Sequence, residues 1–364
     1  MKVLHVINSL IIGGAEKLIS ESLTYYSKFG LEVELLTFKH YDNFLFEDLK
    51  KDKIKVNTLN SSSVYNPINI FKLIPYLSKF DIIHVHLFPA QYWVAFAKII
   101  TLSKVKLIFT EHNTTNRRRN NSLFKVFDKY TYSCYSKIGC ITYDVKESFE
   151  NYLPSLNERL VIIQNGIRIN KYKEAVKISK CSISSTFNKT DRLLLQVSSF
   201  RPQKNQETLI NAMKKLPPNV KLIFVGDGER KMICQKLSAS LGLENRVRFL
   251  GNREDVPTLL KSVDVSVLSS LWEGFGLVAV ESMAAGTPVI GSNVPGLSSV
   301  IGDKRLLFEV GDDTALANKL MAILFDKALY AELKTYCEER VSDFDIKKMV
   351  NIYVNLYYEV LKIE

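Results

Sequence analysis

Residues 263–288 constrain the fold of this chain most, because they combine a strand, a glycine-rich turn and a helix in one run. Residues 263–268 form a short β-branched segment that is typical of a buried parallel strand. Residues 277–285 contain helix formers without a breaker, and Gly286-Thr-Pro288 ends them. The turn between these segments therefore joins the carboxyl end of a parallel strand to the start of a helix.

This turn has the composition of an anion-binding site. The backbone amides from Gly274 to Leu277 would be first-turn donors without partners inside the helix, and such donors attract anions. Gly274 and Gly276 have no side chains, so a phosphate could approach the backbone. Glu273 and Glu281 lie about two helical turns apart on one face, and a carboxylate there can accept two hydrogen bonds from the vicinal hydroxyls of a ribose. The alternative is a structural corner with two exposed glutamates.

The Glu-x7-Glu segment resembles the donor-binding signature of retaining GT-B glycosyltransferases, and most closely that of glycosyltransferase family 4. The flanking Gly-Thr-Pro-Val and the upstream Phe249-Leu-Gly251 belong to the resemblance. The resemblance covers nearly the whole chain and implies an α/β GT-B fold, in which two Rossmann-like parallel-sheet domains face a cleft. We therefore expect an N-terminal acceptor-binding domain, a linker, a nucleotide-sugar-binding domain and a final helix that packs back on the first domain, over residues 1–170, 171–190, 191–345 and 346–364.

The chain begins with a strand, a glycine turn, a helix and a strand, over residues 2–8, 13–14, 17–29 and 32–38. This order predicts a βαβ unit with a turn that suits a phosphate. No GxGxxG sequence is present, so a dinucleotide site is not predicted. The family resemblance implies that Gly14 contacts the transferred sugar or the donor phosphate. Further along, residues 69–80 have the apolar spacing of an amphipathic helix.

Two predicted strands of the first half carry histidines. His84 and His86 lie on one face of the strand at residues 81–87, and two histidines at this spacing do not by themselves make a metal site. The strand at residues 104–113 ends in Thr-Glu-His-Asn, and functional groups gather at such carboxyl ends. The resemblance implies that His86 approaches the acceptor and that His112 contacts the donor sugar near the reacting carbon. The alternative for His112 is a capping or core histidine.

A basic cluster precedes an aromatic-rich helix expected at residues 122–135. Its members are Arg117, Arg118 and Arg119. These side chains could hold the phosphates of an acceptor at a membrane surface, where each basic residue contributes about 1 kcal/mol, or they could form a solvated loop. The net charge of +11, which is larger in the first half, suits anionic lipids or phosphorylated substrates, or serves solubility alone. No nucleic-acid-binding module surrounds the cluster, so nucleic acid is not an expected partner.

Composition and length limit the class of protein. A chain of 364 residues with 46% apolar residues predicts about two folded domains. The five cysteines are scattered without a CxxC pair, which predicts reduced thiols and no zinc site. The start lacks the features of a signal peptide, and no apolar run approaches the ~18–20 residues that span a bilayer. We expect a cytoplasmic protein that is soluble or peripheral on the inner face of the cytoplasmic membrane.

The turn at residues 199–205 supplies a cation for a diphosphate. Lys204 follows a predicted strand, where an ammonium group is well placed to neutralise a pyrophosphate. The segment resembles the family's Gly-Arg-x4-Lys-Gly pattern, in which the arginine and the lysine hold the donor diphosphate. Ser199 stands at the arginine position, so Arg201 is the candidate to replace it, and Asn205 stands at the final glycine. Nearer the hinge, Arg168 stands where the family usually has aspartate.

The resemblance assigns roles to three groups of residues. Those expected to bind the donor are Gly14, Arg201, Leu250, Val256, Gly274, Phe275, Gly276, Leu277, Val278 and Glu281, with Leu250 and Val256 at the nucleobase. Those expected at the reacting groups are His112, Lys204 and Glu273. Those expected at the acceptor are His86, Arg117, Arg118 and Arg119.

The implied reaction is a metal-independent and cofactor-independent transfer of a hexosyl or N-acetylhexosaminyl group with retention. The donor would be a nucleotide diphosphate sugar, which we expect to be UDP-linked. The acceptor would be a hydroxyl of a glycan or of a polyprenyl-diphosphate-linked oligosaccharide in bacterial capsule or lipopolysaccharide synthesis. Lys204 and the amides from Gly274 onward would stabilise the leaving diphosphate, Glu273 the sugar hydroxyls and Glu281 the ribose.

Two other functions remain open from the sequence. A nucleotide-sugar epimerase or hydrolase of the same fold would consume the donor without an acceptor. A non-catalytic sugar-nucleotide-binding or scaffold protein would bind the nucleotide without turnover. The presence of Lys204, Glu273 and Glu281 favours an enzyme over the non-catalytic alternative.

Overall fold

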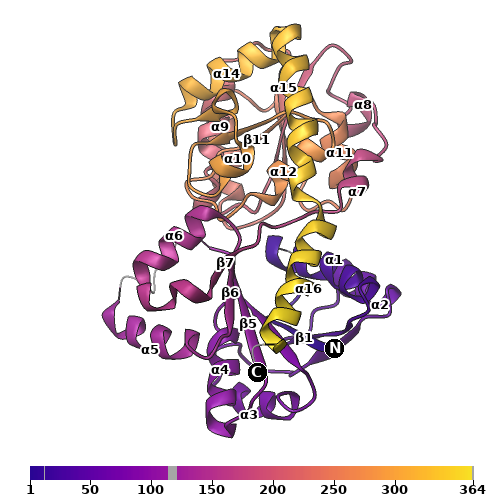
Figure 1. The fold of residues 1–364 in the computed structure, drawn as a ribbon. Coiled ribbons are helices and arrows are strands. Elements are labelled where there is room, and N and C mark those ends of the chain that lie inside the picture. The colour runs from indigo at the N-terminus through magenta and orange to yellow at the C-terminus, as the bar shows by residue number, and fades with distance from the viewer. Residues whose placement is uncertain (12, 114–120, 363–364) are drawn as a thin grey trace. The chain divides into compact units, whose positions relative to one another are not determined.

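The computed structural model describes residues 1–11, 13–113 and 121–362. The chain forms two compact units (Figure 1). The first unit comprises Met1–Gly166 and the chain from Ile346 onward, and the second comprises Ile167–Asp345. Each unit is built on a parallel sheet with helices around it. The predicted α/β architecture with two Rossmann-like parallel-sheet domains is confirmed.

The sheet of the first unit has the strand order β3-β2-β1-β4-β5-β6-β7 among the described residues. Each neighbouring pair is parallel, and every residue of the central strand β4 is buried. Burial on both faces explains why these strands read as continuous apolar runs. The strands are β1 (Lys2–Ile7), β2 (Glu32–Thr37), β3 (Lys55–Thr58), β4 (Ile82–His86), β5 (Lys106–Glu111), β6 (Lys137–Cys140) and β7 (Leu160–Ile162).

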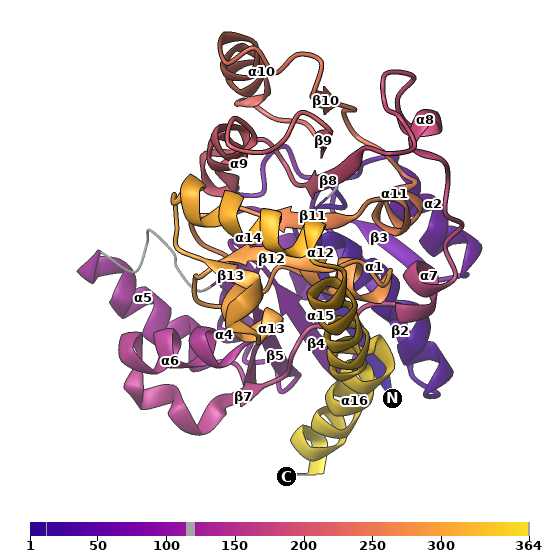
Figure 2. The ribbon, with the colours of Figure 1, turned by 90° about the horizontal axis from the view of Figure 1, so that it is seen from above.

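Helices connect these strands, and the last helix of the chain joins them from the other end of the sequence. Helix α16 lies beside α1 in both ribbon views (Figures 1 and 2), and the rings of Tyr26 and Tyr357 lie 5.8 Å apart between these helices. The helices of this unit are α1 (Gly14–Lys28), α2 (Phe44–Lys51), α3 (Asn69–Leu73), α4 (Ala90–Thr101), α5 (Ser122–Tyr132), α6 (Tyr143–Tyr152) and α16 (Ile346–Lys362), with 3₁₀ helices η1 (Ile74–Tyr76) and η3 (Pro154–Arg159).

Two tyrosines attach α16 to the first sheet. The Tyr357 hydroxyl lies 2.6 Å from His84 Nδ1 on β4, and the Tyr353 hydroxyl lies 2.8 Å from Thr110 Oγ1 on β5. Both tyrosines are buried, so each hydroxyl needs such a partner. A Cβ on Gly139 of β6 would lie only 2.7 Å from the Tyr353 hydroxyl, which explains the glycine there. These contacts confirm that the final helix returns to the first domain.

The second unit has the strand order β10-β9-β8-β11-β12-β13 among its described residues, and its pairs are parallel. The strands are β8 (Arg192–Val197), β9 (Val220–Val225), β10 (Val247–Phe249), β11 (Val265–Leu268), β12 (Val289–Ser292) and β13 (Leu307–Phe308). The helices are α7 (Ile169–Lys173), α8 (Lys180–Ile183), α9 (Gln206–Met213), α10 (Lys231–Ser240), α11 (Val256–Ser262), α12 (Leu277–Ala284), α13 (Leu297–Ile301), α14 (Asp313–Phe325) and α15 (Lys327–Arg340), with 3₁₀ helices η4 (Pro202–Lys204), η5 (Lys304–Leu306) and η6 (Val341–Phe344).

Two local expectations differ from the structure. Residues 171–190, which we expected to form a linker, group with the second unit and carry part of α7 and all of α8. Tyr172 is fully buried, which ties this segment to its unit. The helix expected at residues 69–80 ends at Leu73 and continues as the 3₁₀ turn η1, because Pro75 has no amide hydrogen for an α-helical bond. Among the described residues, we find no helix with the length and apolar character that a membrane span requires.

Candidate functional site

The predicted anion site lies in the second unit, where β11 leads through a turn into α12. Gly276 caps the helix with a φ of 83°, a left-handed conformation that favours glycine. A Cβ on Gly276 would lie 2.6 Å from Leu297 Cδ1, and a Cβ on Gly296 would lie 2.4 Å from the Glu273 carbonyl oxygen. Both glycines therefore allow the turn to pack closely on its neighbour. Within this first turn the Ala279 amide donates to the Gly276 carbonyl oxygen at 2.8 Å, so the amides that precede it, from Gly274 to Leu277, are the ones suited to an anion.

Lys204 and Glu273 form an ion pair beside this turn. Lys204 Nζ lies 2.6 Å from Glu273 Oε2, and the Ser270 hydroxyl donates to the same oxygen at 3.0 Å. The lysine side chain is 20% exposed and the glutamate side chain 13%, so the pair is largely shielded from water. The structure thus brings together two residues that the sequence assigned to the reacting groups. An ammonium has three donor hydrogens, so Lys204 can hold Glu273 and still donate to a phosphate.

The turn that carries Lys204 is fixed by its backbone. Gln196 Nε2 donates to the Lys204 carbonyl oxygen at 3.2 Å, and the Ser269 hydroxyl donates to the Asn205 carbonyl oxygen at 2.8 Å. These bonds connect the end of β8, the turn and the end of β11. Asn205 has a left-handed φ of 44°, which asparagine tolerates better than most residues do. This tolerance explains how asparagine can replace the glycine that the family pattern has here.

The other predicted donor residues of this unit have different environments. Glu281 lies in the second turn of α12 and is buried, with 3% of its surface exposed. Phe275 is also buried and packs edge-on against Phe344, so its side chain belongs to the core and only its backbone can serve the site. Residues half-buried or exposed near the carboxyl ends of β8, β10 and β11 are Arg201, Leu250, Val256, Gly274, Leu277 and Val278.

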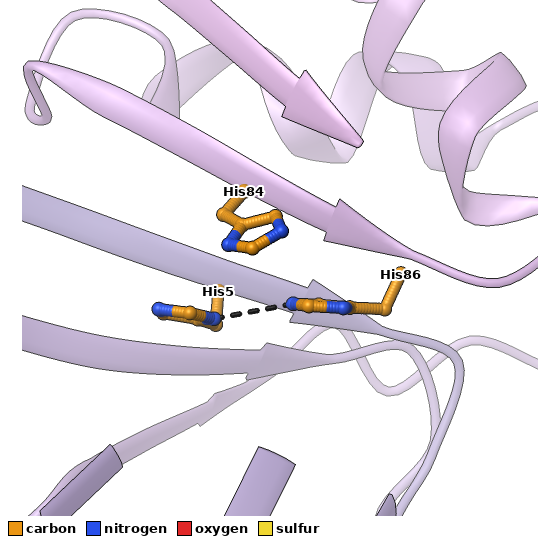
Figure 3. Close-up of side chains that lie close together, drawn as sticks. All are labelled: His5, His84 and His86. Atoms are coloured by element: carbon orange, nitrogen blue, oxygen red, sulfur yellow. Dashed lines mark hydrogen bonds between the residues drawn. The ribbon is translucent and has the colours of Figure 1, made fainter. Parts of the chain in front are cut away.

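The first unit gathers four histidines on one face of its sheet. His5 of β1 pairs in register with His84 of β4, and His86 of β4 pairs with Thr110 of β5. His5 Nδ1 lies 3.2 Å from His86 Nε2, and His86 Nδ1 lies 3.4 Å from His112 Nε2. Figure 3 shows His5 and His86 joined edge to edge, with His84 beside them. The sequence did not single out His5, because only the register of β1 against β4 brings it to this cluster.

Burial keeps these imidazoles neutral. It lowers the pKa of His5 to about 3 and that of His112 to about 4. Burial also lowers the pKa of His84 and of His86 well below the ordinary value, and the neighbouring imidazoles lower both further. Removing a charged imidazolium from water is costly, which is why the neutral form is favoured. At neutral pH each of the four rings therefore carries one N–H.

Both ring nitrogens of His86 are already engaged, so neither is free to contact an acceptor substrate. Its side chain is 4% exposed, and its two nitrogens face His5 and His112. The role of His86 at the acceptor substrate stays a prediction, and in the structure both of its ring nitrogens already have imidazole partners. His112 is more exposed than His5 and His86, because it is half-buried and follows the carboxyl end of β5.

The same cluster has the ligand types of a metal site. Ligand atoms of His5, His84 and His86 all lie within 4.8 Å of one another (Figure 3). However, the two nitrogens of His84 lie 2.6 Å from the Tyr357 hydroxyl and 2.7 Å from the Thr110 hydroxyl. A cation would have to replace these bonds and the bond between His5 and His86. The structure therefore uses the three imidazoles as hydrogen-bond partners.

The remaining predicted residues lie in the first half of the chain. Gly14 is the exposed first residue of α1 and follows Gly13, which has an extended conformation. Arg117, Arg118 and Arg119 lie outside the described residues.

The neutral histidines predict how stability depends on pH. Because the folded-state pKa values lie below 6.5, the unfolded chain binds protons first as the pH falls, and the native state does so only near pH 4 for His112 and pH 3 for His5. Their contribution to the free energy of unfolding is complete above pH 6.5 and falls below it, by at most about 1.4 kcal/mol per pH unit for each histidine. Urea unfolding at pH 7, 6, 5 and 4 measures this slope.

His5→Phe should reduce that slope by the contribution of one histidine, because a benzene ring replaces the imidazole without a titrating group. The matched control is Phe71→Leu, which changes a 63% exposed ring without adding or removing a titrating group and should leave the slope unchanged. Equal slopes for the wild type and His5→Phe would contradict the assignment of a neutral buried His5.

Comparison with known proteins agrees with this architecture. Residues 12–171 match the model of Glycosyltransferase Family 4, and residues 179–340 match that of Glycosyl transferases group 1. The chain is 30% identical to N-acetyl-alpha-D-glucosaminyl L-malate synthase of Bacillus anthracis, over 78% of this chain and 75% of the relative. It is 27% identical to UDP-Gal:alpha-D-GlcNAc-diphosphoundecaprenol alpha-1,3-galactosyltransferase of Escherichia coli, over 81% and 79%.

Among solved structures, that of Anabaena Alr3699/HepE in complex with UDP and glucose superposes with a TM-score of 0.86. The superposition covers 99% of this chain and 100% of that chain at 23% identity, which supports the shared fold. Together with the two family matches and the Bacillus anthracis relative, the parallel-sheet domains and the Glu-x7-Glu turn lead to one assignment. The chain belongs to glycosyltransferase family 4, also described as the group 1 glycosyl transferases, and is a GT-B glycosyltransferase.

Proposed function

We propose that this glycosyltransferase moves a hexosyl or N-acetylhexosaminyl group from a UDP-sugar to a hydroxyl of a glycan or polyprenyl-diphosphate-linked oligosaccharide, with retention and without a metal ion. The acceptor would belong to bacterial surface polysaccharide synthesis. The observation that carries the proposal is the Lys204–Glu273 pair beside the start of α12, with Glu281 in the second turn of that helix. The named substrates of the Escherichia coli relative support a UDP-linked donor and a lipid-linked acceptor.

In this reaction the bond between the anomeric carbon and a phosphate oxygen breaks, and a bond to the acceptor oxygen forms on the same face of the sugar. The acceptor hydroxyl proton goes to the departing phosphate oxygen. Negative charge develops on the diphosphate as the bond breaks. Lys204 and the first-turn amides of α12 stabilise that charge, because fixed donors at the position of developing charge favour the transition state. These positive groups supply what a metal ion supplies in other transferases.

The ion pair changes its partners when the donor binds. Glu273 neutralises Lys204 at 2.6 Å. A diphosphate brings negative charge to the same lysine. One of the three N–H groups of Lys204 then donates to a phosphate oxygen. Glu273 is left with an oxygen for sugar hydroxyls, and Ser270 keeps it in place through the bond at 3.0 Å. Glu281 accepts hydrogen bonds from the ribose hydroxyls.

Helix α5 supplies a surface for a lipid-linked acceptor. Its exposed side chains include Val126, Phe127 and Tyr130, of which Tyr130 is 69% exposed. Lys125 and Lys129 belong to the same helix. Exposed aromatic residues with lysines suit the boundary of an anionic membrane, where rings enter the headgroup region and ammonium groups meet lipid phosphates. We therefore place α5 at the inner face of the cytoplasmic membrane.

Donor binding can be measured by thermal shift with UDP-, GDP-, ADP- and dTDP-sugars. A UDP-sugar at 100 times its Kd should stabilise the protein by about 2.7 kcal/mol through mass action. Glu281→Ala should lose the shift because the ribose contacts are removed. Glu339→Ala, which changes an exposed glutamate of α15, should retain it. If only a sugar of another nucleotide produced a thermal shift, that nucleotide would replace UDP as the proposed donor. A full thermal shift in Glu281→Ala would contradict the role of Glu281.

Lys204→Ala should lower kcat by about 10²–10³, the typical cost of losing one group that stabilises developing charge. Its melting temperature should change far less than its turnover. Lys214→Ala changes an exposed lysine just after α9 and should keep the wild-type kcat. The assay follows donor and product by NMR with a lipid-linked or glycan acceptor.

The same assay examines stereochemistry and metal dependence. The anomeric configuration of the donor should persist in the product, and turnover should survive dialysis against EDTA. Equal kcat for Lys204→Ala and the wild type would show that Lys204 does not stabilise the transition state. Donor consumption without an acceptor would instead favour the epimerase or hydrolase function.

Membrane binding can be measured by sedimentation with vesicles that contain anionic lipid. The double variant Phe127→Ser and Tyr130→Ser should reduce the bound fraction several-fold, because it removes apolar area from the interface. The matched control is Phe71→Ser, which changes a 63% exposed aromatic residue of α3. Equal binding by the wild type and the double variant would exclude α5 as the docking surface.

A further inference from the structure

His5, His86 and His112 form a line of hydrogen-bonded imidazoles across three neighbouring strands. The line runs from His5 Nδ1 to His86 Nε2 over 3.2 Å, and from His86 Nδ1 to His112 Nε2 over 3.4 Å. The rings of His5 and His86 are inclined by only 8° and meet edge to edge (Figure 3). This geometry fits a hydrogen bond in the plane of both rings, with one nitrogen as donor and the other as lone-pair acceptor.

Because each ring is neutral, the two bonds must point the same way. His86 carries a single N–H and takes part in both bonds, so it donates in one and accepts in the other. If His86 donates through Nδ1, it accepts from His5 Nδ1–H, and the proton of His112 lies on Nδ1. If His86 donates through Nε2, it accepts from His112 Nε2–H, and the proton of His5 lies on Nε2. The protonated nitrogen of His112 is thus coupled to that of His5.

The buried end of the line decides between these two arrangements. His5 is 1% exposed, and its Nε2 has no hydrogen-bond partner among the described residues. In the second arrangement this atom would be a buried N–H without an acceptor, which proteins tolerate less often than a buried acceptor without a donor. The adjoining cavity of ≈ 10 Å³, lined by His5 and Tyr26 among others, has room for at most about one water molecule. The first arrangement is therefore favoured.

We infer that His86, supported by His5, is a positioning residue that holds His112 in the tautomer with its proton on Nδ1. His86 Nδ1–H donates to His112 Nε2, so Nδ1–H of His112 is the group left to donate to a ligand. The functional meaning of this inference rests on the proposed contact of His112 with the donor sugar. A sugar hydroxyl oxygen accepts from that N–H, and the neutral ring adds no charge.

The test begins with the ring nitrogens of the full-length wild-type protein, observed without ligand by long-range ¹⁵N–¹H correlation NMR. Protonated and bare imidazole nitrogens resonate far apart, and the signals of His112 are identified by their loss in His112→Gln. We expect Nδ1 of His112 to be protonated and Nε2 to be bare. The opposite result in the wild type overturns the inference.

Variants then test the role of His86. His86→Leu should shift His112 toward the Nε2–H tautomer and lower kcat/KM about tenfold, since His112 then loses its donor partner. His86→Asn should restore the Nδ1–H tautomer, because its side-chain amide nitrogen is bonded to Cγ as ring Nδ1 is. Tyr353→Phe removes a buried hydrogen bond of the same cluster at Thr110 and should leave the tautomer unchanged.

Two further results would overturn the inference, one from the variant His86→Leu and one from the addition of Zn²⁺. One is an unchanged His112 tautomer in folded His86→Leu. The other is a stoichiometric change of the His5 and His86 signals on addition of Zn²⁺, which would show these nitrogens to be metal ligands. A separate titration with UDP-sugars distinguishes the proposed function. Unmoved His112 signals in that titration, while the protein binds the donor, would contradict the sugar contact and leave the tautomer established.

Discussion

Four histidines lie side by side within the first domain, and the need to keep each one neutral and hydrogen-bonded organises much of that domain. An unpaired buried polar group costs free energy, so His84 requires both the Tyr357 and the Thr110 hydroxyls. Tyr357 comes from the last helix of the chain. The return of α16 to the first sheet is therefore more than apolar packing, because the helix supplies a hydroxyl that His84 on the central strand β4 uses. The same strand continues to His86, so the contact that attaches the helix and the line that ends at His112 share one short segment.

The second domain has a different requirement, because its site needs a charged group, whereas the histidines of the first domain must stay neutral. Lys204 is largely shielded from water, and a shielded ammonium requires a counter-ion. Glu273 supplies it at 2.6 Å, from a turn whose geometry depends on Gly276 and Gly296. The turn thus places a carboxylate beside the amides that start the helix. In the proposed reaction the incoming diphosphate takes one N–H group of the lysine, and Glu273 keeps an oxygen available to the sugar.

Local sequence patterns predicted most of the fold, and tertiary pairing explains what they missed. The run at residues 263–288 contains its strand, turn and helix in consecutive residues, so β11 and α12 could be located from the sequence. The return of α16 followed from the family resemblance, whereas the tyrosine contacts that fix it appear only in the structure. His5 joins the cluster through the register between β1 and β4, which no spacing in the sequence reveals. Likewise, Tyr172 of the expected linker is fully buried, and its helix α7 packs on α11 and α12, which lie far along the chain. Lys204 and Glu273 lie 69 residues apart in the chain, so local sequence patterns could not predict that they form an ion pair.

The two ends of the bond that the proposed reaction breaks need groups of different charge. As the sugar leaves its phosphate, the ring becomes positive and the diphosphate becomes more negative. A protonated imidazole near the ring would oppose the first change, whereas a neutral one can hold a hydroxyl without that penalty. Burial lowers the pKa of His112 to about 4, so the ring stays neutral at physiological pH. An ammonium group favours the second change, and Lys204 provides it. In the proposed contact with the sugar, His112 donates a hydrogen bond without carrying charge, so the position of its single proton is the property that the protein must control.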